Sequence, residues 1–208
     1  LAAAEYIAGQ LEASGVLPAA GTQSFLQPVA RLVAPRLSAP VLEIAPEAGG
    51  ATVSLAHGAD FGEQVYRHGG SGAANGPLTF VGFATQTTKY ADFRGLDLRG
   101  QVALVLAENM PAEFDNEALI RGAGAILIIS DDAAPRTDWL PGESGFMQKP
   151  TFPILHVRPD AADRLLSAAG SSVADLRAAV QEYKDSGAER LWFAKPLGLK
   201  VAARVEFG

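Results

Sequence analysis

Side chains that commonly bind metals or act as catalytic bases are few in this chain. It has no cysteine and three histidines, His57, His68 and His156. His57 precedes Asp60 by three residues, a spacing that matches no common zinc motif, and no His-Glu-x-x-His sequence occurs. His156 falls in an apolar segment, where a hydrogen-bonded structural histidine is the simpler interpretation. The residues therefore predict no native metal site and no bound cofactor.

A serine in a glycine-rich segment offers a candidate nucleophile. The segment reads His68-Gly-Gly-Ser71-Gly-Ala. A nucleophile elbow requires Gly-x-Ser-x-Gly between a strand and a helix. Here Ala73 replaces the second glycine, and a strand is expected to follow. A surface loop is favoured, and a small serine hydrolase that uses Ser71 with His156 or His68 is the alternative.

Acidic residues gather between residues 108 and 117, where Glu108, Glu113, Asp115 and Glu117 occur. They do not follow the Asp-x-Asp-x-Asp-Gly pattern of a calcium loop. Asp115 and Glu117 lie near the start of an expected helix, where carboxylates interact favourably with the helix dipole. We interpret the group as solvated and helix-stabilising.

A long proline-rich loop, residues 131–150, carries the large apolar side chains Trp139, Phe146 and Met147. Loops of this length are often functional, and aromatic side chains are common at binding hot spots. Two interpretations stay open, because these side chains could contact a partner or fold back over the core.

The composition limits the classes of partner. The 208 residues include 48% hydrophobic and 19% charged residues, enough apolar material for one domain with flanking segments. The formal net charge of −6 argues against binding to nucleic acid or to anionic membranes. No apolar run approaches the roughly 20 residues that span a bilayer. We expect no nucleic-acid partner and no membrane insertion.

The hydrophobic pattern predicts an α/β fold. Continuous apolar runs at 102–106 and 125–129 are typical of buried strands. Ser172 is expected to cap one helix, and Gly15 to end another. The expected helices span 2–14, 111–121, 159–169 and a segment from 173. The other expected strands span 41–44, 52–55, 78–83, 152–157 and 199–207.

Four segments resemble the protease-associated (PA) domain, a module that accompanies peptidases and does not itself cut. The shared features are a strand ending in Val-Gly-Phe, the hinge Asp-Phe-Arg-Gly-Leu-Asp-Leu-Arg-Gly-Gln, a helix leading into Gly-Ala-Gly-Ala-Ile-Leu-Ile-Ile, and a Pro-x-x-x-Val strand before a helix. They lie in Pro77–Phe83, Tyr90–Leu106, Glu117–Ile129 and Thr151–Leu166. The resemblance implies a β-barrel-like mixed sheet flanked by helices.

Both flanks resemble parts of co-catalytic dizinc aminopeptidases of the glutamate carboxypeptidase and transferrin receptor type. Residues 3–18 are similar to the first helix of those enzymes, and Leu199–Phe207 to the strand on which their catalytic core resumes. The family's metal-ligand motifs are not in this sequence. The resemblance therefore implies an N-terminal flank (1–39), a PA domain (40–170) and a C-terminal flank (171–208). The apolar faces of 2–14 and 199–207 are expected to lack a partner.

The function implied by this resemblance is non-catalytic. The chain would belong to a metallo-aminopeptidase-like protein, and it would shape substrate access or bind a peptide or protein. Zinc is expected only in the catalytic domain. The chain begins at Leu1 in a helical pattern, so we expect a trimmed or processed bacterial chain without its targeting segment. Its expected location is secreted, periplasmic or on the cell surface.

Overall fold

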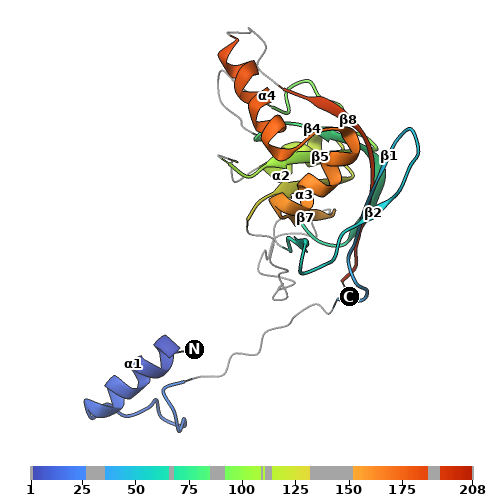
Figure 1. Ribbon diagram of the computed structural model, residues 1–208. Helices are drawn as coiled ribbons and strands as arrows, with labels where there is room; N and C mark the ends of the chain where they lie inside the picture. The colour runs from blue at the N-terminus through green and yellow to red at the C-terminus, as the bar shows by residue number, and fades with distance from the viewer. Residues whose placement is uncertain are drawn as a thin grey trace. The chain divides into compact units, whose positions relative to one another are not determined.

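The computed structural model of the chain describes residues 2–26, 36–65, 68–84, 92–108, 110, 114–131, 152–186 and 193–207 (Figure 1). The chain divides into two compact units, residues 1–32 and 33–208. Among the described residues, no helix combines the length and the apolar character needed to cross a membrane.

The smaller unit consists of helix α1 (Ala2–Ala13) and the segment after it. The helix ends as the sequence predicts, because Gly15 takes a φ of 73° and the amide of Val16 donates to the carbonyl oxygen of Leu11 at 3.1 Å. None of the helical residues is buried.

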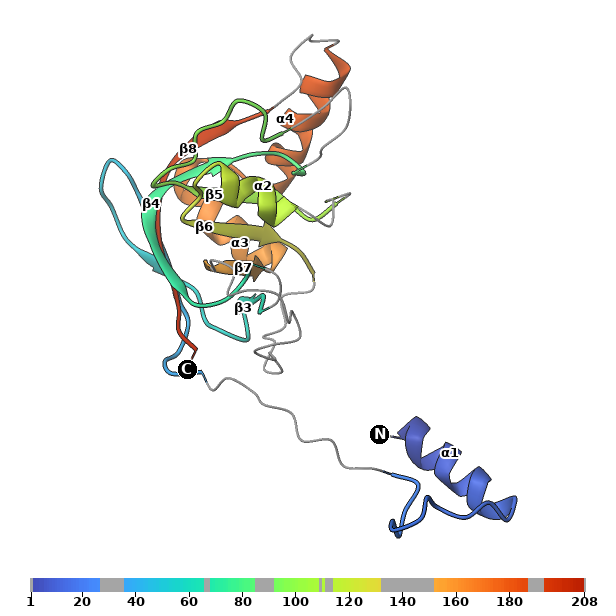
Figure 2. The same cartoon turned by 180° about the vertical axis from the view of Figure 1, so that it is seen from behind.

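The larger unit is built on an eight-stranded mixed sheet with the order β2-β1-β8-β4-β5-β6-β7-β3. The sheet curls along its length (Figures 1 and 2). In chain order the strands are β1 (Val41–Pro46), β2 (Val53–Ser54), β3 (Phe61–Glu63), β4 (Gly72–Phe80), β5 (Val102–Leu106), β6 (Ala125–Ile129), β7 (Ile154–Val157) and β8 (Lys195–Val205).

The sheet has a parallel part and an antiparallel part. Strands β4, β5, β6 and β7 run parallel to one another, whereas β8 pairs antiparallel with both β1 and β4. Strand β3 pairs antiparallel with β7 and forms one edge, and β2 forms the other. Every residue of β5 and β6 is buried, as expected for parallel strands covered on both faces.

Helices cover the two faces of the parallel strands. They are α2 (Phe114–Ile120), α3 (Pro159–Leu166), the 3₁₀ helix η1 (Ser167–Ala169) and α4 (Val173–Asp185). Leu104 and Leu127 share one cluster with α3 and α4, whereas Val105 and Ile128 share another with α2. Figure 1 shows α3 and α4 on the near side of the sheet, and Figure 2 brings α2 forward.

The predicted class, a mixed sheet flanked by helices, is confirmed. The cap of α4 is also confirmed, because the amide of Asp175 donates to Ser172 Oγ at 3.1 Å. The start of β4 was predicted wrongly. This strand begins at Gly72, inside the segment expected to be a loop, because Gly72–Pro77 pairs with β8.

The last strand differs from expectation as well. The apolar face of 199–207 was predicted to lack a partner, and this is wrong, because Leu199 and Val201 are fully buried between β1 and β4. The predicted domain boundaries at residues 40 and 171 stay predictions. Helix α4 and strand β8, both from the predicted C-terminal flank, belong to the same compact unit as the sheet.

Candidate functional site

The hydroxyl of Ser71, the candidate nucleophile, contacts the last residues of the larger unit. Ser71 Oγ accepts a hydrogen bond from the amide of Phe207 at 2.9 Å and lies 3.4 Å from its carbonyl oxygen. Ser71 immediately precedes β4, so it lies at a strand start and not at a strand-to-helix turn. In this position Ser71 joins the chain after β8 to the start of β4.

His57 belongs to a cluster around the buried carboxylate of Glu63. His57 Nε2 lies 2.5 Å from Glu63 Oε2, and the guanidinium of Arg36 contacts Glu63 Oε1. The side chain of Glu63 is fully buried, and the His57 ring packs edge-on against Phe61. A buried carboxylate requires such partners, because an unpaired charge in the interior is strongly destabilising. The cluster links β3 to the start of the larger unit.

The other two histidines lie near the same edge of the sheet. His156, on β7, places Nε2 at 3.2 Å from Gln64 Oε1. His68 is buried, and its amide donates to Asp115 Oδ2 at 3.4 Å. These contacts place both histidines in structural surroundings, as the sequence predicts for His156.

Asp60 does not join His57 as a ligand pair. Its Oδ2 accepts from the amide of Ala56 at 2.9 Å, and its Oδ1 accepts from Arg164 at 2.5 Å. The hydrogen bond from Ala56, together with the nearby guanidinium of Arg164, lowers the pKa of Asp60 below its ordinary value. Asp60 therefore ties the turn before β3 to α3.

The acidic residues between 108 and 117 are separated by the fold. Glu108 pairs with Arg177 on α4, while Glu117 lies 4.0 Å from Arg121 one helical turn later. Asp115 is fully buried, so the predicted solvated role is wrong for this residue. Glu113 lies outside the described residues.

The hinge motif stabilises a turn between β4 and β5. Asp97 Oδ1 accepts from both the amide and Nε of Arg99, and these bonds lower the pKa of Asp97 to about 2. Gln101 Nε2 donates to the Asp97 carbonyl oxygen at 3.0 Å, and Gln101 Oε1 accepts from the Thr79 hydroxyl at 2.6 Å. The polar residues of the motif thus bond to one another across the turn.

The motif residue Asp92 lies close to the glycine of Val-Gly-Phe. Asp92 is fully buried, and Gly82 has a φ of 74°. A Cβ added to Gly82 would lie 3.1 Å from both carboxylate oxygens of Asp92. The Asp92 carboxylate therefore packs so closely against Gly82 that a larger residue at position 82 would crowd it.

The predicted partner-contacting side chains Trp139, Phe146 and Met147 lie outside the described residues. Their role stays a prediction. Over the described ranges, no group of three or more His, Cys, Asp or Glu side chains comes close enough to hold a metal ion. The expectation that this chain binds no zinc also stays a prediction.

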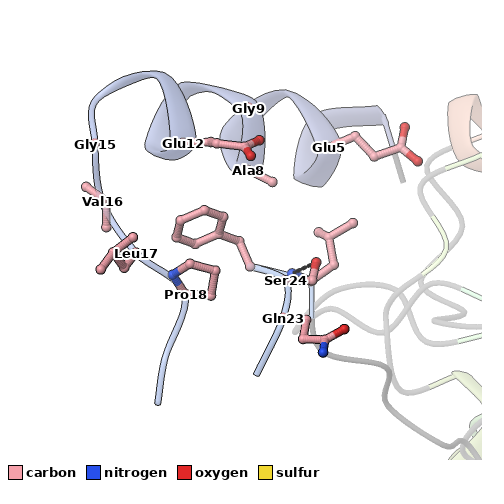
Figure 3. Close-up of a pocket in the computed structure, with 12 residues that line it drawn as sticks. Glu5, Ala8, Gly9, Glu12, Gly15, Val16, Leu17, Pro18, Gln23 and Ser24 are labelled. Carbon is pink, nitrogen blue, oxygen red and sulfur yellow. Dashed lines mark hydrogen bonds between the residues drawn. The ribbon is translucent and has the colours of Figure 1, made fainter. Parts of the chain in front are cut away.

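A groove of about 420 Å³ lies within the smaller unit, between α1 and the segment that follows it (Figure 3). Glu5, Ala8 and Glu12 line its helical wall. Apolar residues line the opposite wall, namely Val16, Leu17, Pro18, Phe25 and Leu26. No residue of the helix is buried there, so the groove is an open surface feature.

The other side of α1 carries the apolar stripe predicted from the sequence. Ile7 and Leu11 lie one turn apart and are 57% and 37% exposed, and Tyr6 is 69% exposed. Six of the eight large exposed hydrophobic residues in the described chain lie in this unit: Tyr6, Ile7, Leu11, Val16, Leu17 and Leu26. The expectation that this helix face lacks a partner stays a prediction.

Sequence reasoning missed Glu63 and Gln64, the polar residues that organise the edge at β3. Both are buried, and although Glu63 also contacts the nearby His57, their other partners, Arg36 and His156, lie far away in the sequence. The segment 61–65 shows no clear strand alternation. The segment forms a strand because it pairs with β7, more than 90 residues away in the sequence. No local sequence pattern could have predicted this strand.

The chain matches no protein-family model and no curated protein. Among solved structures it is similar to an aminopeptidase from Aneurinibacillus sp. strain AM-1, with 16% identity and a TM-score of 0.44. That match covers 86% of this chain and 32% of the aminopeptidase. A second match, to the subtilisin-like protease Apa1 from the Antarctic psychrotroph Pseudoalteromonas sp. AS-11, has 14% identity, a TM-score of 0.35, and coverage of 80% and 33%.

Both of these similar structures are peptidases, and the chain spans about a third of the length of each. Likeness at this level of identity and TM-score carries no argument about the activity of this chain.

Proposed function

We propose that this chain is a non-catalytic, protease-associated module of a metallo-aminopeptidase-like protein. In that protein it would lie beside the catalytic domain, where it would shape substrate access or bind a peptide or protein. The zinc ions would belong to the catalytic domain. A secreted, periplasmic or cell-surface location is part of the same proposal.

The proposal rests mainly on one observation: the candidate catalytic side chains make structural contacts. Ser71 accepts from the Phe207 amide, His57 contacts the buried Glu63, and His156 contacts Gln64. A nucleophile and its base need a mutual hydrogen bond and access to a substrate. These side chains instead connect strands and chain ends.

Two further features support the proposal. The motif residues behind the family resemblance, such as Asp97 and Gln101, form the internal bonds of a turn. In addition, Arg36 and Phe207 form a β-bridge, so the first and last described residues of the larger unit lie side by side. Adjacent ends are the arrangement that allows a domain to be carried within a longer chain.

A fluorophosphonate probe tests the proposal against the serine-hydrolase alternative. The full chain should remain unlabelled, as should the Ser71→Ala variant. Labelling of the wild type that disappears in Ser71→Ala would overturn the proposal. A known serine hydrolase in the same reaction shows that the probe is active.

A further inference from the structure

The two ends of the larger unit are joined by a short set of bonds, which we call the clasp and define as residues 36–38, Ser71 and residues 206–207. Arg36 and Phe207 form an antiparallel bridge, and the Leu37 amide donates to the Glu206 carbonyl oxygen at 2.9 Å. The Ser38 hydroxyl donates to Glu206 Oε2 at 2.6 Å, and Ser71 Oγ accepts from the Phe207 amide.

Backbone bonds of this kind are few, and isolated bridges at chain ends open easily. The clasp has one bridged pair, Arg36 with Phe207, outside the named strands. The β1–β8 ladder holds the same two segments from Val41 and Arg204 inward. Beyond that ladder, the backbone of the clasp alone would hold the two ends only weakly.

The buried carboxylate of Glu63 adds a second, ionic attachment. Its two oxygens contact different side chains, the Arg36 guanidinium from the clasp and the His57 ring from the turn before β3. The Glu63 side chain is fully buried, whereas that of Arg36 is 27% exposed. Withdrawing Arg36 would leave the buried Glu63 carboxylate without its guanidinium partner and in contact with His57, which is unfavourable for a buried charge.

We propose that Glu63 is a positioning residue that locks the clasp. Through Arg36, its carboxylate couples the edge strand β3 to the point where the chain enters and leaves the larger unit. Opening of the clasp then requires loss of a buried ionic contact.

Hydrogen exchange measured by NMR on the full chain tests this proposal. The amides of Leu37 and Phe207 report on the clasp, and the amide of Gln64, which donates to the Ile154 carbonyl oxygen at 2.8 Å, reports on the edge beside β3. The amide of Val105, on the fully buried strand β5, reports on global unfolding.

In Glu63→Gln, the Leu37 and Phe207 amides should exchange roughly 10- to 100-fold faster, the range expected for loss of a charged hydrogen bond. Exchange at Val105 should be unchanged under the same conditions. Arg36→Gln should accelerate the clasp amides similarly, and it should also accelerate Gln64, because the effect is coupled to the edge strand. Should Glu63→Gln fail to fold, the Arg36→Gln variant decides the question, because the Arg36 side chain is partly exposed.

Glu43→Gln is the matched control, since it removes a carboxylate from β1 that accepts a hydrogen bond from the exposed Ser54. This variant should leave the Leu37 and Phe207 amides unchanged. The proposal is overturned if Arg36→Gln leaves these amides unchanged. It is also overturned if they accelerate only by the factor seen at Val105, which would indicate general destabilisation.

Discussion

At the scale of single residues, Gly76 on β4 leaves no room for a side chain beside Gly100. A Cβ at this position would lie 1.9 Å from the carbonyl oxygen of Gly100. Gly76→Ala should therefore lower the free energy of unfolding by about 3 kcal/mol, the scale of an overpacked interior. Urea denaturation measures this change.

Gly124→Ala is the control for that substitution. Its added Cβ would meet the Ala74 methyl group at 3.2 Å, a contact that a small shift can relieve. The expected loss is below about 1 kcal/mol. Equal losses in the two variants would contradict the packing argument.

Asp60 should make the free energy of unfolding depend on pH in the acidic range. Because the folded state lowers its pKa, the unfolded chain binds the proton first as the pH falls. The stabilisation is thus fully present above the ordinary value of 3.8 and is lost as the pH falls through the lower folded value. Asp60→Asn should cost about 1 kcal/mol at pH 7, after allowance for the solvent-exposed Arg164, and the cost should shrink below pH ~4.

Asp160→Asn is the matched control, since it removes a 67% exposed carboxylate that lies 3.8 Å from the same Arg164. Urea denaturation at several pH values should show almost no cost for this variant. A pH-independent cost for Asp60→Asn would contradict the assigned pKa direction.

At the scale of elements, β8 holds the antiparallel strands together. Leu199 is fully buried on this strand, and its neighbour Lys200 is exposed. Leu199→Ala should cost about 2–5 kcal/mol through lost burial and a residual cavity. Lys200→Ala should change the free energy of unfolding by less than about 0.5 kcal/mol. Similar values for the two variants in thermal or urea unfolding would contradict the central position of β8.

Elements with a local signal could be predicted from the sequence, and elements defined by distant partners could not. Local sequence patterns predict strands β5 and β6 from their continuous apolar runs, and the start of α4 from its cap, Ser172. The glycine-rich start of β4 reads as a loop, because its strand geometry comes from pairing with β8 more than 120 residues later. The cluster around Glu63 could not be predicted either, because it also depends on residues that are distant in the sequence.

At the scale of the whole molecule, the exposed apolar stripe of α1 distinguishes the smaller unit. Exposed apolar stripes promote association. The full chain should therefore self-associate as its concentration rises, and Ile7→Gln combined with Leu11→Gln should reduce this in sedimentation experiments. Ile120→Gln is the control, because Ile120 is 72% exposed on the larger unit and should have little effect. A wild-type chain that stays monomeric would contradict this prediction.

The central claim is that this chain is non-catalytic, and one experiment on a single sample tests it most directly. The full chain is equilibrated with zinc and dialysed, its zinc content is measured by elemental analysis, and hydrolysis of a leucine anilide is followed. The account predicts less than stoichiometric zinc and no turnover. One or two tightly bound zinc ions per chain with turnover would contradict it, and would assign a catalytic site to this chain.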